Sequence, residues 1–229
     1  PTAHQAAELE FVQFDAEHAV DQIISQKRLA FFAAEPTDSA KTNANEAQIV
    51  RLLVQRIYHL YQLNQLQFKA DESVGIITPY RSQIALIRRE LQALHLPELM
   101  DITVDTVERY QGSQRDIILY SFAVNSQQQL DFVANTVESD GVEVDRKLNV
   151  ALTRAKKQLF VMGCDAIIGT NPLYRRLINH IRSKGGFVKA TIAQLENGSI
   201  PSAQLPLLTY ETLEKDKGCN PKFEAAFQR

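Results

Sequence analysis

The sequence predicts an α/β fold in three layers, with a mostly parallel sheet between two layers of helices. Short apolar segments of strand length alternate with longer segments that have helical periodicity, and this alternation is typical of such a sheet. The composition agrees, because 229 residues with 45% hydrophobic and 23% charged side chains suffice for one substantial core. No apolar stretch approaches the roughly 20 residues of a membrane-spanning helix, so we expect no membrane partner.

The first elements are a weak helix, a strand and a strong helix. Residues 15–27 have weak helical character, and the apolar run 28–34 is typical of a buried strand. A polar loop follows, and apolar residues then recur at helical spacing over 49–61. Asn43 and Glu46 stand in capping-box relation ahead of this helix.

Three more strands and a helix are predicted in the middle of the chain. The apolar run 74–78 ends before a proline, and 82–94 has the spacing of an amphipathic helix. Strands are predicted at 102–107 and 117–124, with a polar turn containing Gly112 between them. Ligands of parallel sheets gather at the carboxyl ends of the strands, which makes the loops after these strands candidate sites.

The last third of the chain begins with a polar segment, 125–144, which we expect to be an exposed excursion. A helix is predicted over 145–155 and a strand over 158–163. Asn-Pro opens a further helix at 171–185, because proline suits the first helical position and glycine the residue after the end. Periodicity is lost beyond residue 190.

These elements suggest a helical lead-in from an upstream domain at 1–27, an α/β domain at 28–190 and a C-terminal tail at 191–229. Because the chain begins with proline, we expect a piece of a longer protein. Cys164 and Cys219 are too far apart for a CxxC motif, so neither a disulfide framework nor a cysteine zinc site is expected. This cysteine usage favours a reducing, cytoplasmic location.

Several kinds of site are excluded by the sequence. The net charge of −2 argues against a free-standing protein that holds nucleic acid by bulk charge. The nine glycines form neither GxxxxGK[ST] nor GxGxxG, so the chain has no phosphate-binding loop of its own. The five histidines lack ligand spacing, and we expect no metal site.

Three polar segments remain as candidates for chemistry. They read GIITPYRSQ at 75–83, TVERYQGSQRD at 106–116 and RKLNVALTRAKK at 146–157. On a helix the last segment has a buried seam of small and apolar residues, with Lys147 and Arg154 in one stripe beside it. The seam consists of Leu148, Ala151, Leu152 and Ala155. Two fixed cations there could present charge to an anion.

These segments resemble motifs IV, V and VI in the second RecA-like domain of superfamily 1 helicases of the Upf1/DNA2 type. The family patterns are a strand ending in TPY…Q, a TVD-x-[FY]-QG-x-E turn and RRLNVALTRA. The stretch 39–47 is also similar to a segment ahead of that family's first helix. The resemblance covers 28–187 and implies a RecA-like, P-loop NTPase-type fold without its own Walker A loop.

The resemblance implies the C-terminal half of an ATP-dependent nucleic-acid helicase that moves 5′ to 3′ along a single strand. ATP with Mg²⁺ would lie between two RecA-like domains, and the first domain of the full-length chain would supply the Walker lysine and the metal-binding acids. Arg154 matches the catalytic arginine that meets charge developing on the γ-phosphate. Such an arginine finger contributes roughly 10³–10⁵ in rate. We expect the fragment alone to be inactive.

The resemblance also implies two sets of binding residues. The ATP-binding set is Gly112, Gln114, Lys147 and Arg154. The set for single-stranded DNA or RNA is Thr78, Pro79, Tyr80, Gln83, Thr106 and Gln111. The family has an acid where this chain has Gln114 and an aspartate where it has Glu108, and an amide cannot act as a carboxylate.

Other interpretations stay open. Tyr80 and Gln83 fit a packing role as well as a binding role, and Thr106 is also an ordinary β-branched strand residue. The Gln114 departure supports a degenerate RecA-like docking module without ATPase activity. An unrelated doubly wound enzyme that binds a small molecule lacks an identifiable catalytic residue. A Walker A loop and an acid pair upstream would decide for the helicase.

Overall fold

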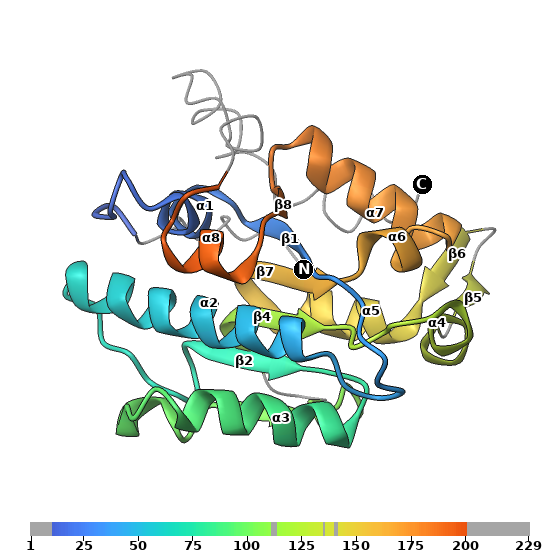
Figure 1. Cartoon of the computed structure of the whole chain (residues 1–229), viewed down its shortest axis with the longest axis horizontal. Coiled ribbons are helices and arrows are strands. Elements are labelled where there is room, and N and C mark those ends of the chain that lie inside the picture. The colour runs from blue at the N-terminus through green and yellow to red at the C-terminus, as the bar shows by residue number, and fades with distance from the viewer. Residues whose placement is uncertain (1–10, 111–113, 135, 140–141, 201–229) are drawn as a thin grey trace.

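Six parallel strands form the central sheet, in the order β3-β2-β4-β7-β1-β8 (Figure 1). The computed structural model describes residues 11–110, 114–134, 136–139 and 142–200. The strands of the sheet are β1 (Leu29–Ala33), β2 (Val74–Ile77), β3 (Thr103–Asp105), β4 (Arg115–Ser121), β7 (Ala155–Gly163) and β8 (Phe187–Lys189). A separate antiparallel hairpin consists of β5 (Thr136–Ser139) and β6 (Val142–Asp145).

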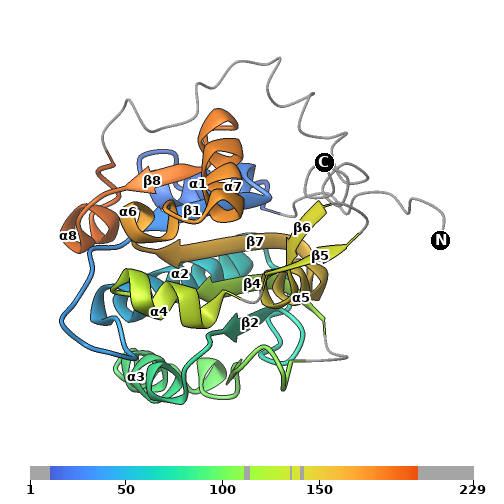
Figure 2. The same cartoon turned by 90° about the vertical axis from the view of Figure 1, so that its right-hand side faces the viewer.

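Helices cover both faces of the sheet. The described helices are α1 (Ala19–Gln26), α2 (Ala44–Leu63), α3 (Arg81–Gln92), α4 (Gln127–Val133), α5 (Arg146–Arg154), α6 (Asp165–Ile168), α7 (Pro172–Ser183) and α8 (Ile192–Glu196), with a 3₁₀ turn, η1 (Pro97–Leu99). Side chains of α1, α2, α3 and α8 pack on one face. Those of α4, α5, α6 and α7 pack on the other, and Figure 2 shows α4 and α5 in front of the strands with α2 behind. The predicted three-layer RecA-like fold is confirmed.

The strands are buried on both faces, which explains their continuous apolar sequences. In β1, Ala30 and Phe32 belong to the core under α2, whereas Phe31 and Ala33 belong to the core under α7. All four residues of β2 are buried as well.

Only half of the expected capping box forms at the start of α2. The side chain of Asn43 accepts a hydrogen bond from the backbone N–H of Glu46 at 3.0 Å. The Glu46 side chain does not return to Asn43, because its Oε2 accepts from Ser121 Oγ at 2.7 Å. Gln83 replaces it, and its Oε1 accepts from the Asn43 N–H at 2.9 Å.

Two segments differ from the expectations. The excursion predicted at 125–144 contains α4 and the β5–β6 hairpin, and α4 buries Leu130 and Val133. With two buried apolar residues in seven, α4 is too short for its period to be recognised. The segment expected to be a tail after residue 190 begins with a short helix, α8. Its Leu195 is buried in the core beside α2. Residues 201–229 lie outside the described part of the chain.

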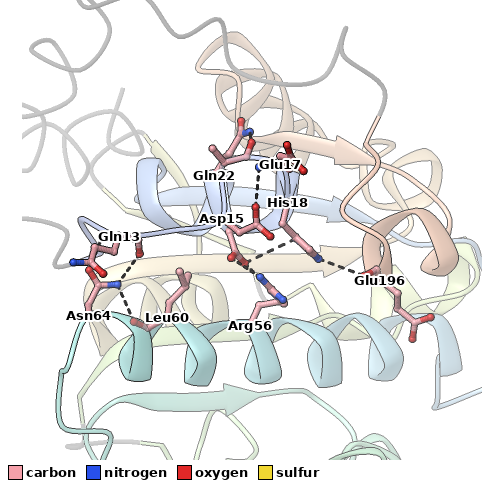
Figure 3. A network of polar contacts seen from close by, with 11 residues as sticks. Gln13, Asp15, Glu17, His18, Gln22, Arg56, Leu60, Asn64 and Glu196 are labelled. Atoms are coloured by element: carbon pink, nitrogen blue, oxygen red, sulfur yellow. Dashed lines mark hydrogen bonds and ion pairs between the residues drawn. The ribbon is translucent and has the colours of Figure 1, made fainter.

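The N-terminal segment is joined to the domain by polar contacts (Figure 3). Asp21 of α1 is fully buried, and its Oδ1 accepts a hydrogen bond from Arg56 Nε of α2 at 2.7 Å. The His18 ring contacts the Glu196 carbonyl oxygen at 3.3 Å, which links α1 to α8. The described part of the expected lead-in therefore packs as a part of this α/β domain. No helix among the described residues has the length and apolar character needed to span a bilayer.

Candidate functional site

The loops that follow β2, β3 and β4 leave the sheet at one edge. Ile77, the last residue of β2, is in register with Asp105 of β3 and with Tyr120 of β4. Thr78 and Thr106 come directly after two of these strands. The Thr78 N–H donates to the Asp105 carbonyl at 3.2 Å, so the segment Thr78-Pro79-Tyr80 and the turn at Thr106 lie side by side at the carboxyl edge.

Gln114 and Arg154, two of the residues expected to bind ATP, lie at the opposite edge. Arg115 and Ala155, the first residues of β4 and β7, are in register with each other. Gln114 and Arg154 immediately precede them, and Gln114 Nε2 donates to the Thr153 carbonyl at 3.1 Å. Because α5 runs into β7 without a loop, its last residue is held at the start of that strand. We expected ligand-binding groups at the carboxyl ends of the strands, and these two residues lie at the other end.

The chain between β3 and β4 returns from one edge to the other across the sheet. The Thr106 carbonyl accepts from the Tyr110 N–H at 3.1 Å, which forms a turn. Tyr110 is buried, and burial raises the pKa of its hydroxyl to about 12. Its ring lies against Gly75, where a Cβ would overlap the Tyr110 hydroxyl. Glycine is needed there for this close approach. Gln111 and Gly112, two predicted site residues, lie outside the described residues.

Helix α5 is held firmly at its first residue. Asp145 caps it, and its Oδ1 accepts from the Leu148 N–H at 2.6 Å. The Tyr174 hydroxyl of α7 donates to Asp145 Oδ2 at 2.9 Å. Leu148 and Ala151 are buried on the seam that the sequence predicted, and the other two seam residues are partly buried.

Lys147 and Arg154 project from one side of α5, seven residues apart. Among the described residues neither forms an ion pair, and the buried Arg154 Nε has no hydrogen-bond partner. The neighbouring Lys157 differs, because its Nζ contacts Asp116 Oδ2 at 3.0 Å. The two cations are thus available to an anion. Their chemistry fits a phosphate chain.

A magnesium ion does not fit the residues that are described. In the ranges for which side chains are placed, no three acidic, histidine or cysteine side chains lie close enough together to hold a metal. The neighbouring Gln114 contributes an amide, whereas the usual side-chain ligand of magnesium is a carboxylate.

The residues expected to contact nucleic acid at the carboxyl edge are placed at different depths. Thr78 and Gln83 are fully buried, whereas Pro79 and Thr106 are partly exposed. Gln83 Nε2 donates to the Asn43 carbonyl at 3.0 Å and to Ser121 Oγ at 3.1 Å. Gln83 therefore lies beneath the surface, where it supports the start of α3. Tyr80 is 9% exposed, and burial raises the pKa of its hydroxyl.

Comparison with known proteins decides the family. Residues 7–166 match the protein family AAA_12, described as an AAA domain. This chain belongs to that family. The RecA-like fold and the helicase names of its relatives make it an Upf1/DNA2-type superfamily 1 helicase domain.

The relatives of this helicase domain are much longer proteins. ATP-dependent helicase NAM7 of Saccharomyces cerevisiae is 30% identical over 164 residues, which cover 67% of this chain and 16% of the relative. Regulator of nonsense transcripts 1 of Dictyostelium discoideum is 32% identical over 162 residues, covering 69% and 11%. DNA replication ATP-dependent helicase/nuclease DNA2 of Bos taurus is 35% identical over 111 residues, covering 48% and 10%. The chain thus spans about a tenth to a sixth of these relatives.

The helicase domain also has exposed cations that the sequence reasoning did not assign. Arg81 begins α3 directly after the Thr78-Pro79-Tyr80 segment, and Arg109 follows Thr106. Lys41 lies beside the start of α3, because Ser82 Oγ donates to its carbonyl at 2.8 Å. None of the three cations pairs with an acid among the described residues. Arg81 and Arg109 lie inside the recognised motifs, so their positive charge was the feature of the sequence that could have marked them as binding residues.

Proposed function

We propose that this chain is the second RecA-like domain of an ATP-dependent helicase and that Arg154 meets the terminal phosphate of ATP held by the first domain. The observation that carries the proposal is the Arg154 guanidinium, which has no ion pair among the described residues, at the end of a firmly capped helix. A guanidinium stays charged and bridges two phosphate oxygens. Lys147 lies in the same stripe and adds a second cation toward the phosphates.

The first domain of the same full-length chain supplies the rest of this ATP site. It provides the Walker lysine and the acids that hold Mg²⁺, which the described residues here do not. ATP when bound supplies the free energy for movement along the strand. The cytoplasmic location indicated by the cysteine usage belongs to the same proposal.

The carboxyl edge forms part of the channel for single-stranded DNA or RNA. Pro79 and Thr106 reach the surface there. The exposed cations Arg81 and Arg109 follow them closely in the chain, and the Lys41 carbonyl accepts a hydrogen bond from Ser82. The Thr106 hydroxyl and the cations contact backbone phosphates, which position a strand without reading its sequence. The Pro79 face supports a base by packing. A few placed cations reconcile strand binding with a net charge of −2.

The pure chain is expected to hydrolyse ATP negligibly. In the full-length helicase, Arg154→Ala is expected to lower kcat by roughly 10³–10⁵. Arg176→Ala is the matched control, because Arg176 is an exposed arginine on α7. Turnover by the pure chain that Arg154→Ala abolishes would contradict the proposal, and so would a full-length kcat that Arg154→Ala leaves unchanged.

Strand binding is tested separately by fluorescence anisotropy with a labelled single-stranded oligonucleotide and the whole 229-residue chain. Arg81→Ala and Arg109→Ala are each expected to reduce the slope of log affinity against log salt by about 0.7. Arg176→Ala should leave that slope unchanged. Equal slopes for all variants would exclude the carboxyl edge as the strand site.

One observation favours a second candidate, a docking module without ATPase activity. The Gln114 amide donates to the Thr153 carbonyl, and a carboxylate could not make this hydrogen bond. Gln114 thus has a structural use that the family's acid lacks. A full-length protein without strand-stimulated ATPase activity would favour this candidate.

A further inference from the structure

A buried carboxyl group lies beneath the carboxyl edge of the sheet. Glu46, in the first turn of α2, is fully buried. Its Oε2 accepts from Ser121 Oγ at 2.7 Å and from the Ala123 N–H at 2.9 Å. Its Oε1 is buried without a hydrogen-bond partner among the described residues. An apolar residue would fill this place at less cost, so simple packing does not explain a carboxyl group here.

The contacts of Glu46 extend to the start of α3. Ser121 Oγ, which donates to Glu46, accepts from Gln83 Nε2 at 3.1 Å. Gln83 also exchanges two hydrogen bonds with the backbone of Asn43, at 2.9 and 3.0 Å. Because Gln83 is the third residue of α3, these bonds fix the first turn of that helix. The segment from Thr78 to Arg81 is held between this turn and β2.

The same carboxyl group holds a strained loop after β4. Ala123 has φ of 50°, in the left-handed region that residues with a Cβ rarely adopt. Its N–H is the group that donates to Glu46 Oε2. Two residues later, Asn125 Nδ2 donates to the carbonyls of Ser39 and Thr42 at 2.8 and 2.9 Å. The loop is therefore fixed on both sides of the strained residue.

We propose that Glu46 is a positioning residue that, through Ser121 and Gln83, holds the Thr78–Tyr80 segment and the start of α3 in the conformation that binds a nucleic-acid strand. This inference rests on the proposed function of the carboxyl edge. Burial raises the pKa of Glu46 to about 8, so the carboxyl is largely neutral near neutral pH. Glutamine is then the conservative replacement, because its carbonyl oxygen accepts the same two hydrogen bonds.

Hydrogen–deuterium exchange of the 229-residue chain tests the positioning directly. Glu46→Ala is expected to raise exchange in 78–83 and 122–126, and Glu46→Gln is expected to restore it close to the wild-type level. Val54→Ala is the control, since Val54 is fully buried in the same helix and belongs to the apolar core. Exchange that rises equally in Val54→Ala and Glu46→Ala would overturn the proposal. If Glu46→Ala does not fold, Ser121→Ala removes the hydroxyl that joins Gln83 to Glu46.

Affinity for a single-stranded oligonucleotide provides the second measurement. We expect Glu46→Ala to bind roughly tenfold more weakly than wild type, and Glu46→Gln and Val54→Ala to bind within about twofold. Equal affinity for Glu46→Ala and wild type would overturn the positioning role and leave the strand site intact. A wild-type chain that binds no strand would refute the strand site and with it positioning for strand binding, whatever the exchange result.

Discussion

The stability of this domain is expected to fall as the pH rises from mildly acidic to mildly alkaline, because Glu46 is buried. Burial raises its pKa from 4.5, the value for an exposed carboxyl, to about 8. Between these pH values the unfolded chain releases the proton and the folded chain keeps it. The unfolded state then binds fewer protons, so the free energy of unfolding decreases as the pH increases. The contribution is fully present below pH 4.5 and is lost as the pH passes through 8.

The size of the effect follows from the two pKa values. Taken at face value, they correspond to a loss of about 5 kcal/mol across the window. The pKa of about 8 already includes the hydrogen bonds to Oε2, which favour the charged form, and relaxation of the interior around the charged carboxylate reduces the loss. We therefore expect a measured loss of a few kcal/mol, which is a large share of the stability of a typical domain.

Urea unfolding at a series of values from about pH 5 to about pH 9 measures this loss. Glu46→Gln cannot ionise, so its free energy of unfolding should change less with pH than that of wild type. Glu98→Gln, an exposed acid after α3, is the control and should follow wild type. Parallel curves for wild type and Glu46→Gln would refute the reasoning, because Glu46 would then titrate as it does in the unfolded chain.

Three further changes test packing and polar contacts by urea or thermal unfolding. Arg56→Ala leaves the buried Asp21 without its arginine partner and should cost about 3 kcal/mol; a loss below about 1 kcal/mol would contradict a buried pair. Gly75→Ala forces Tyr110 to move and should cost about 1–3 kcal/mol, whereas an unchanged melting temperature would mean that the ring shifts freely. Asp145→Ala removes the cap of α5 and should cost about 1–2 kcal/mol, with a smaller loss for Asp145→Asn, which keeps an acceptor.

Local sequence was sufficient for the longer elements. The apolar spacing over 49–61 predicted α2, and Asn171 with the following proline predicted the first residue of α7. The seam at Leu148 and Ala151 was also predicted, because helical period alone decides which side of α5 is buried. The short elements β8 and α8 were missed, since three to five residues carry too little periodicity and neither has the continuous apolar run that marked β2.

The residues of the motifs were sufficient to predict the family, but they did not predict how deeply each side chain is buried. The sequence identified Gln83 as part of a motif and left its packing and binding roles open. The structure buries it between Asn43 and Ser121, because α2, α3 and β4 converge there. The sequence also did not show that Arg154 lies at the edge opposite the carboxyl edge. That position depends on which strand α5 enters and on the register of that strand with β4.

The sequence by itself determined the class of fold, the long helices and the helicase family, because period, caps and motifs are properties of neighbouring residues. Tertiary structure alone decided which distant groups share an environment. Glu46 and Ser121 are 75 positions apart and meet only because α2 packs across β4. The capping-box spacing around Asn43 could not reveal that the carboxyl of Glu46 turns into the core, since the free energy that decides its direction comes from contacts made elsewhere in the chain.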